Sequence, residues 1–127
     1  MIAIDTSSMR RYLAGEDGDD VVLVHAAIQS RRAVLPPVVV TELLSEKTLS
    51  EKIQAVIGRT PIVPLLEGYW ERAGLLRASI LRRGLKARLA DCLIAQACLD
   101  SDVPFITNDR DFRHFVSDGL VLLVQER

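Results

Sequence analysis

Strand-like and helix-like segments alternate along this chain, and the alternation limits the folds that it can adopt. Short apolar runs are separated by longer stretches whose apolar residues recur at helical spacing. The expected strands are 2–5, 33–35, 62–63, 104–106 and 121–124. Strands that are joined through helices pair in parallel, because the helix returns the chain to the starting edge of the sheet. The pattern predicts an α/β fold: one α/β/α sandwich over residues 1–127, with a central, mainly parallel sheet of four to five strands.

The stretches between these runs read as helices. The expected helices cover about 8–14, 19–31, 37–46, 50–57, 67–83, 89–99 and 110–115. The segment 38–44 is ambiguous, because its valines favour a strand. We assign it to a helix, since Pro37 suits a first helical position and Glu42 opens a good helix-forming stretch. The predicted inner side of the helix at 67–83 comprises Trp70, Ala73, Leu76, Ile80 and Leu81.

Composition excludes several classes of protein. Hydrophobic residues make up 49% and charged residues 26%, which is ordinary for a globular domain. No apolar run approaches the roughly 18 residues of a membrane helix, and no secretory signal is visible. We therefore expect a cytoplasmic protein without a membrane partner. Cys92 and Cys98 lie on different faces of one expected helix, so we expect both to be buried and unpaired.

Acidic residues interrupt or end several of the apolar segments. Asp5 ends the opening run, and Asp109 closely follows the strand expected at 104–106. Glu42 and Asp91 each interrupt an apolar stretch that should form a helix. An isolated carboxylate in such surroundings is costly to desolvate unless it is paired or binds a metal. Several of them along one chain suggest a shared cation site.

The predicted topology brings these acids to one edge. In open parallel sheets the functional crevice lies beyond the carboxyl ends of the strands, where Asp5 and Asp109 should point. Glu42 and Asp91 lie near the starts of helices that face the same edge. Four carboxylates without a cation would repel one another, whereas hard oxygen ligands suit Mg²⁺ or Mn²⁺. Two such ions about 3.5–4 Å apart are a known arrangement for phosphodiester hydrolysis.

Each acid also has a simpler interpretation. Asp5 could cap the following helix, as Thr6 or Ser7 could do equally well. Asp91 could be a first-turn acid that is favoured by the helix dipole. Glu42 could lie on an exposed helix face, and 108–111 is by itself a turn sequence. The combination of all four favours the cation site.

The four segments that hold these acids are Ile4-Asp5-Thr6-Ser7, Leu35-Pro36-Pro37-Val38-Val39-Val40-Thr41-Glu42-Leu43, Ala90-Asp91-Cys92-Leu93-Ile94-Ala95 and Thr107-Asn108-Asp109-Arg110-Asp111-Phe112. In order and spacing they resemble the PIN-domain family, and within it the VapC-type toxin ribonucleases of toxin–antitoxin pairs. The resemblance covers essentially the whole chain. No single motif is specific, whereas the ordered set is.

The resemblance implies a metal-binding quartet of Asp5, Glu42, Asp91 and Asp109 that holds Mg²⁺ or Mn²⁺. In this scheme Asp5 and Asp91 are the principal ligands, and Asp109 supports a second or more weakly held ion. Glu42 binds metal or orients the attacking water.

Other residues receive supporting roles by the same resemblance. Asp111 is expected to be a bystander, and Ser7 and Thr107 to hydrogen-bond the ligand carboxylates or phosphate. The implied activity is a metal-dependent endoribonuclease with an RNA substrate. The implied partners are an antitoxin, often encoded just upstream, and a second copy in a homodimer. We expect antitoxin contacts on the first two helices, at Tyr12, Leu13, Val21 and Val24.

Charge is distributed unevenly. The net charge of −1 argues weakly against nucleic-acid binding. Between 72 and 88, however, five arginines and one lysine occur without any acid, just ahead of Asp91. This basic segment is either a solvated helix face or a surface that contacts phosphate.

Rival functions fit the sequence less well. An aspartyl-phosphate phosphatase with Asp5 as nucleophile usually needs a second acid two residues later, where Ser7 stands. A PIN-like module that binds RNA or protein without cutting is disfavoured by the presence of all four acids. His25 and His114 lack a serine or cysteine partner and read as structural or surface residues. Tyr69 and Trp70 could stack on a base, but their spacing predicts core positions.

Overall fold

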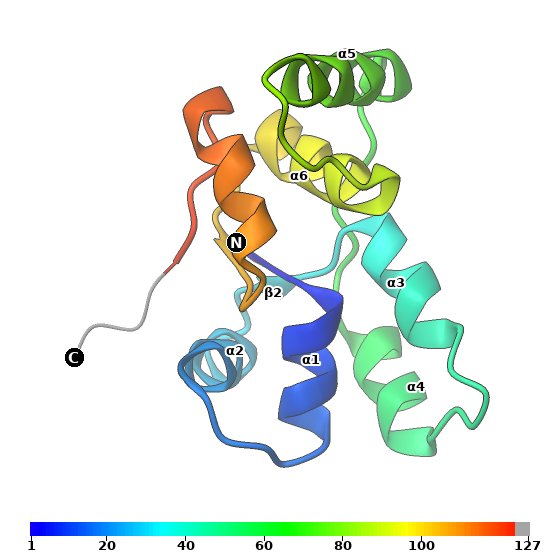
Figure 1. Cartoon of the computed structure of the whole chain (residues 1–127). Coiled ribbons are helices and arrows are strands. Elements are labelled where there is room, and N and C mark those ends of the chain that lie inside the picture. Colours follow the sequence, from blue (N-terminus) through cyan, green and yellow to red (C-terminus); the bar gives the residue numbers. More distant parts are fainter. Residues whose placement is uncertain (124–127) are drawn as a thin grey trace.

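Three short parallel strands form the sheet at the centre of the computed structural model, which describes residues 1–123 (Figure 1). The order is β2-β1-β3, so that β1 (Ile2–Ile4) lies between β2 (Ala33–Val34) and β3 (Phe105–Ile106). Ile2 lies opposite Ala33, and Ala3 lies opposite Phe105. Because all three strands run in the same direction, their carboxyl ends meet at one edge, and this edge carries the candidate site.

The predicted parallel α/β sandwich is confirmed, but fewer strands form than expected. The apolar runs at 62–63 and 121–124 each contribute a single parallel bridge, one beside β2 and one beside β3. The bridges join Leu35 to Ile62 and Phe105 to Leu122. Pro36 and Pro61 adjoin the first bridge and have no N–H to extend it. Val124 lies outside the described residues.

Helices cover both sides of the strands. They are α1 (Thr6–Leu13), α2 (Asp19–Gln29), α3 (Pro37–Leu44), α4 (Glu51–Arg59), α5 (Tyr69–Arg82), α6 (Leu89–Ser101) and the 3₁₀ helix η1 (Arg110–Asp118). In Figure 1, α5 and α6 lie above the strands, whereas α1 and α2 lie below them. The valine-rich segment that could have been a strand is α3, with Pro37 at its start as predicted.

The inner face of α5 differs in part from the prediction. Its buried residues are Tyr69, Ala73, Leu76 and Ile80. Trp70 and Leu81, expected in the core, are 62% and 48% exposed. Helical geometry explains the correction. Tyr69 and Ala73 lie on the buried face of the helix, so Trp70, the residue after Tyr69, points outward. The Tyr69 hydroxyl donates a hydrogen bond of 2.6 Å to the Leu93 carbonyl and ties α5 to α6.

Both cysteines lie on α6 and are buried and unpaired, as expected. The start of this helix lies at the surface, where Leu89 is 60% exposed. Within residues 1–123, no helix has both the length and the apolar character needed to cross a bilayer.

Candidate metal centre

Asp5 is the first residue after β1 and the most enclosed carboxylate of the site, at 6% exposure. It accepts hydrogen bonds from the Thr6 backbone N–H (2.9 Å), the Thr107 hydroxyl (2.7 Å) and the Ser7 hydroxyl (3.4 Å). The bond from Thr6 makes Asp5 the N-cap of α1. Capping and membership of the acidic site are therefore compatible roles of one side chain. The bond from Thr107 joins the ends of β1 and β3.

The turn after β3 supplies two more carboxylates. The Thr107 hydroxyl accepts a hydrogen bond from the Asp109 N–H at 3.0 Å. Asp109 in turn caps η1, because its carboxylate accepts the Asp111 N–H at 2.9 Å. These bonds fix the turn so that both acids face Asp91. One carboxylate oxygen from each of Asp91, Asp109 and Asp111 lies within 4.8 Å of the other two, and all three residues are half-buried.

Asp111 thus belongs to the group of acids, although the sequence suggested a bystander. Its Oδ2 also lies 3.5 Å from the Lys86 ammonium. The sequence contains a signal for the position of Asp111, which stands two residues after Asp109, an acid that can cap a helix. In the structure, the Asp109 carboxylate accepts the N–H of Asp111.

Asp91 occupies the first turn of α6. Partial burial is the largest cause that raises the pKa of Asp91 to about 6, and repulsion from Asp109 and Asp5 adds to it. The nearby Arg88 opposes that rise. Burial also raises the pKa of Asp5, which the hydrogen bonds from Thr107 and Thr6 partly offset. In both acids, burial and repulsion between carboxylates outweigh the interactions that stabilise the charged form.

Glu42 lies at the margin of this group, on α3. Its carboxylate accepts a hydrogen bond of 2.7 Å from the Thr6 hydroxyl, next to Asp5. Its charge contributes to the raised pKa of Asp5. Within the described residues, the close cluster of Asp91, Asp109 and Asp111 includes neither Glu42 nor Asp5. The structure therefore brings all four predicted acids to one edge. Asp91 and Asp109 form the close cluster together with Asp111, whereas Asp5 and Glu42 lie beside it.

The donor set suits a hard divalent cation. The clustered groups offer only carboxylate oxygens, which Mg²⁺ and Mn²⁺ prefer. The two histidines lie outside the cluster, as expected: the His25 ring packs against Tyr12, and the His114 Nδ1 lies 3.0 Å from the Lys86 carbonyl oxygen.

The basic segment 72–88 does not form one open cationic surface. Arg72 pairs with Asp100 at 2.6 Å, and Arg83 pairs with Asp118 at 3.1 Å. Arg77 donates to the Ala87 carbonyl at 2.9 Å. These arginines bind parts of the fold itself, and a phosphate-contacting surface along this segment stays a prediction.

Sequence reasoning missed a buried network below the site. Asp20 is 5% exposed and accepts a hydrogen bond of 2.7 Å from Ser8. The Arg11 Nε lies 3.3 Å from the same carboxylate. The sequence places Asp20 in a group of acids near residue 17, which hides its position. The available signal is its helical spacing with Val24 and Ala27, the buried residues of α2.

Comparisons with known proteins agree with this fold. The profile of the PIN domain family matches residues 2–116. A search of curated proteins yields no match. The chain belongs to the PIN-domain family.

Similar solved structures come from several bacteria. VapBC2 from Rickettsia felis, bound to a DNA fragment from its promoter, has a TM-score of 0.76 and 17% identity, covering 97% of this chain and 98% of that one. DNA-bound VapBC from Salmonella typhimurium has a TM-score of 0.73 and 20% identity, covering 96% of each chain. VapBC-1 from nontypeable Haemophilus influenzae has a TM-score of 0.73 and 17% identity, covering 100% of each chain. At these identities the likeness establishes the fold.

The electrostatics of Asp91 predict a stabilising substitution. The folded-state pKa of about 6 exceeds the ordinary value of 3.8, so folding binds protons between these values. The contribution of Asp91 to the stability of the metal-free protein should therefore fall as the pH rises from about 4 to about 6. Asp91→Asn should raise the free energy of unfolding by about 1–2 kcal/mol near neutral pH and leave it unchanged below pH ~4. Denaturant unfolding in EDTA at both pH values measures this difference.

In magnesium, we expect the wild-type protein to be more stable than Asp91→Asn. A bound cation should raise the midpoint temperature of thermal unfolding of the wild-type protein. Asp91→Asn lacks one ligand, so its midpoint should rise less. Asp102→Asn is the control, because this exposed residue lies at the other end of α6. An equal shift in all three proteins would contradict a metal site at Asp91.

Proposed function

We propose that this protein is a metal-dependent endoribonuclease and the toxin of a toxin–antitoxin pair. The observation that carries the proposal is the convergence of Asp91, Asp109 and Asp111 beside Asp5 at the carboxyl edge of a PIN-domain sheet. The motifs that resemble VapC-type ribonucleases contain these same acids. Likeness in fold to VapBC structures supports the same assignment.

In this proposal the four aspartates hold Mg²⁺ or Mn²⁺. When bound, such an ion would lower the pKa of a water molecule and would neutralise charge that develops on the phosphoryl oxygens. Thr6 and Thr107 fix the Asp5 carboxylate through the hydrogen bonds described above, which limits the rearrangement needed on binding. Glu42 is restrained by Thr6 and acts on the attacking water rather than as a principal ligand.

The reaction is hydrolysis of an RNA phosphodiester. The water oxygen forms a bond to phosphorus while the bond from phosphorus to the 3′-oxygen breaks. Glu42 accepts the proton that the water loses, and the leaving 3′-oxygen takes a proton from solvent. The products carry a 5′-phosphate and a 3′-hydroxyl, and the 2′-hydroxyl is not a nucleophile.

Cleavage of total cellular RNA in Mg²⁺ tests this function. EDTA should abolish it, and Asp5→Asn or Asp91→Asn should reduce it on the order of 100-fold or more while the domain stays folded. Asp102→Asn again serves as the exposed control. End mapping of the fragments measures the chemistry, and 2′,3′-cyclic phosphate ends would refute it. RNA that binds but is never cut would favour the non-catalytic module, and a phosphorylated Asp5 would favour the phosphatase.

An antitoxin is the proposed protein partner, and α1 and α2 are its proposed contact surface. Two residues expected there are unsuitable, because Leu13 and Val24 belong to the core. Tyr12 and Val21 are half-buried and, with the exposed Val22, line a pocket of about 340 Å³. The surface available for contact is thus the outer side of these helices.

Val22→Glu should weaken binding of the antitoxin encoded beside this gene by roughly tenfold or more, because the substitution adds a charge to an apolar contact. Val116→Glu is the matched control, since Val116 on η1 is similarly exposed, at 49% against 52%. Co-purification and titration calorimetry measure both effects. Equal binding by the two variants would contradict this contact surface.

A homodimer is the second proposed assembly. Trp70, Leu75 and Leu81 on α5 and Leu89 on α6 are exposed apolar residues that a partner copy could cover. Light scattering should report a dimer, and Leu75→Glu should convert it to a monomer. Leu44→Glu on α3 is the control. A wild-type protein that is already monomeric at micromolar concentration would refute the dimer.

A further inference from the structure

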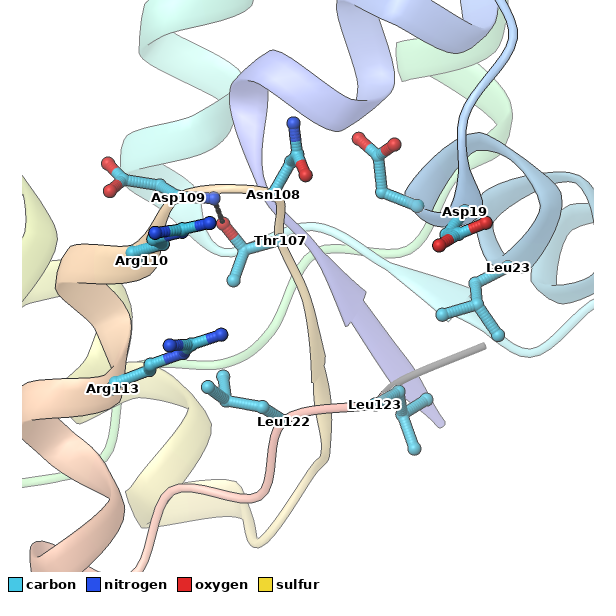
Figure 2. A pocket seen from close by; sticks show the side chains of 10 residues that line it. Asp19, Leu23, Thr107, Asn108, Asp109, Arg110, Arg113, Leu122 and Leu123 are labelled. Atoms are coloured by element: carbon cyan, nitrogen blue, oxygen red, sulfur yellow. Dashed lines mark hydrogen bonds between the residues drawn. The ribbon is translucent and has the colours of Figure 1, made fainter. Parts of the chain in front are cut away.

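A pocket of about 290 Å³ adjoins the acidic site (Figure 2). Thr107 and Asp109 belong to both, so the turn after β3 is a wall that the two share. Figure 2 shows the Asp109 carboxylate directed away from the pocket, while Arg110 and Arg113 extend from η1 toward it. The acidic cluster and the pocket are therefore neighbours on either side of the turn after β3.

The geometry of η1 explains why two arginines line the pocket together. A 3₁₀ helix has three residues per turn, so residues three apart lie on the same face. Phe112 and Phe115 form one such pair and are buried in the core. Arg110 and Arg113 form another pair and are exposed at the pocket.

Neither of these two guanidinium groups forms an ion pair within the part of the chain that the structure describes, although aspartates also line the pocket. Their side chains also form no hydrogen bond there, in contrast to those of Arg11, Arg72 and Arg83. Two adjacent like charges repel, and an anion that bridges them relieves the repulsion.

Other pocket groups define what kind of anion fits. Asp20 lines the pocket, but its carboxylate is already bound by Ser8 and Arg11. Asp19 lies across the pocket from the arginines in Figure 2. Leu23, Leu122 and Leu123 supply an apolar wall. The pocket thus has a cationic end, an acidic side at Asp19 and an apolar side, and its cationic and apolar parts suit a phosphate that carries a sugar and a base.

We infer that this pocket binds the RNA nucleotide next to the scissile phosphate. Arg110 and Arg113 bind the neighbouring phosphate of that nucleotide, not the scissile one. This inference rests on the proposed nuclease function. It adds substrate-binding residues that lie outside the acidic quartet. Arginine suits this role because its planar group can offer two parallel N–H donors to one phosphate.

Binding of single-stranded RNA of mixed sequence tests the inference without cleavage. Fluorescence anisotropy is measured in Mg²⁺ on the Asp91→Asn background, with and without Arg110→Gln and Arg113→Gln. Each substitution should raise Kd on the order of tenfold, and the slope of log K against log salt should lose about 0.7 for each contact removed. Lysine at either position should keep the salt slope and restore part of the affinity.

Arg59→Gln is the matched control. Arg59 is an exposed arginine beside Ala33 and Pro61, at the opposite edge of the sheet. An unchanged unfolding midpoint for all variants would show that η1 remains folded. If the arginine variants bind RNA as Arg59→Gln does, the inference is overturned. It is equally overturned if they lose antitoxin binding while RNA binding stays constant, since the pocket would then serve a protein partner.

Cleavage by the otherwise wild-type protein separates the two proposals. Removal of both arginines should raise KM with little change in kcat, because they contact a neighbouring phosphate rather than the reacting one. Wild-type protein that binds RNA through these arginines but never cuts it would remove the nuclease proposal and leave an RNA-binding pocket. Normal cutting with an unchanged KM would remove the pocket alone.

Discussion

Negative charge held at the carboxyl edge of the sheet is the constraint around which the neighbouring residues are arranged. Pairing of β1 with β3 brings Asp5 beside Thr107, although 102 positions separate them in the sequence. The hydrogen bonds to Asp5 orient it and lower part of its desolvation cost, but its pKa stays raised. Hydrogen bonds therefore position this carboxylate without neutralising the group. Under the proposed function, a divalent cation would supply the positive charge that these acids lack.

The edge at which these acids meet was predictable because it follows from chain direction. Once the first strand and the strand before Thr107 are taken as parallel neighbours, Asp5 and Asp109 must emerge at the same end. Asp91 follows from the cost of desolvation, since an acid in the first turn of an otherwise apolar helix needs a compensating partner or ion. These steps need only the order of elements, which the apolar runs supplied.

Other features depended on contacts between distant residues and were not predictable. The basic segment looked like one surface because its charges are contiguous, yet Arg72 and Arg83 pair with Asp100 and Asp118 on later elements. A count of local charge contains no information about such partners. The shortfall in strands, by contrast, has a local cause, because proline beside Ile62 removes the donor that a longer ladder requires.

The 3₁₀ geometry of η1 connects these observations to the net charge. With a period of three, the sequence from Arg110 to Phe115 divides into three faces. One face is buried, and another faces the pocket with arginines. The third carries Asp111 and His114, and both contact Lys86. A slightly acidic protein can therefore present a cationic wall beside its acidic cluster. What governs the approach of a polyanion is this local arrangement of charge rather than the sum over the chain.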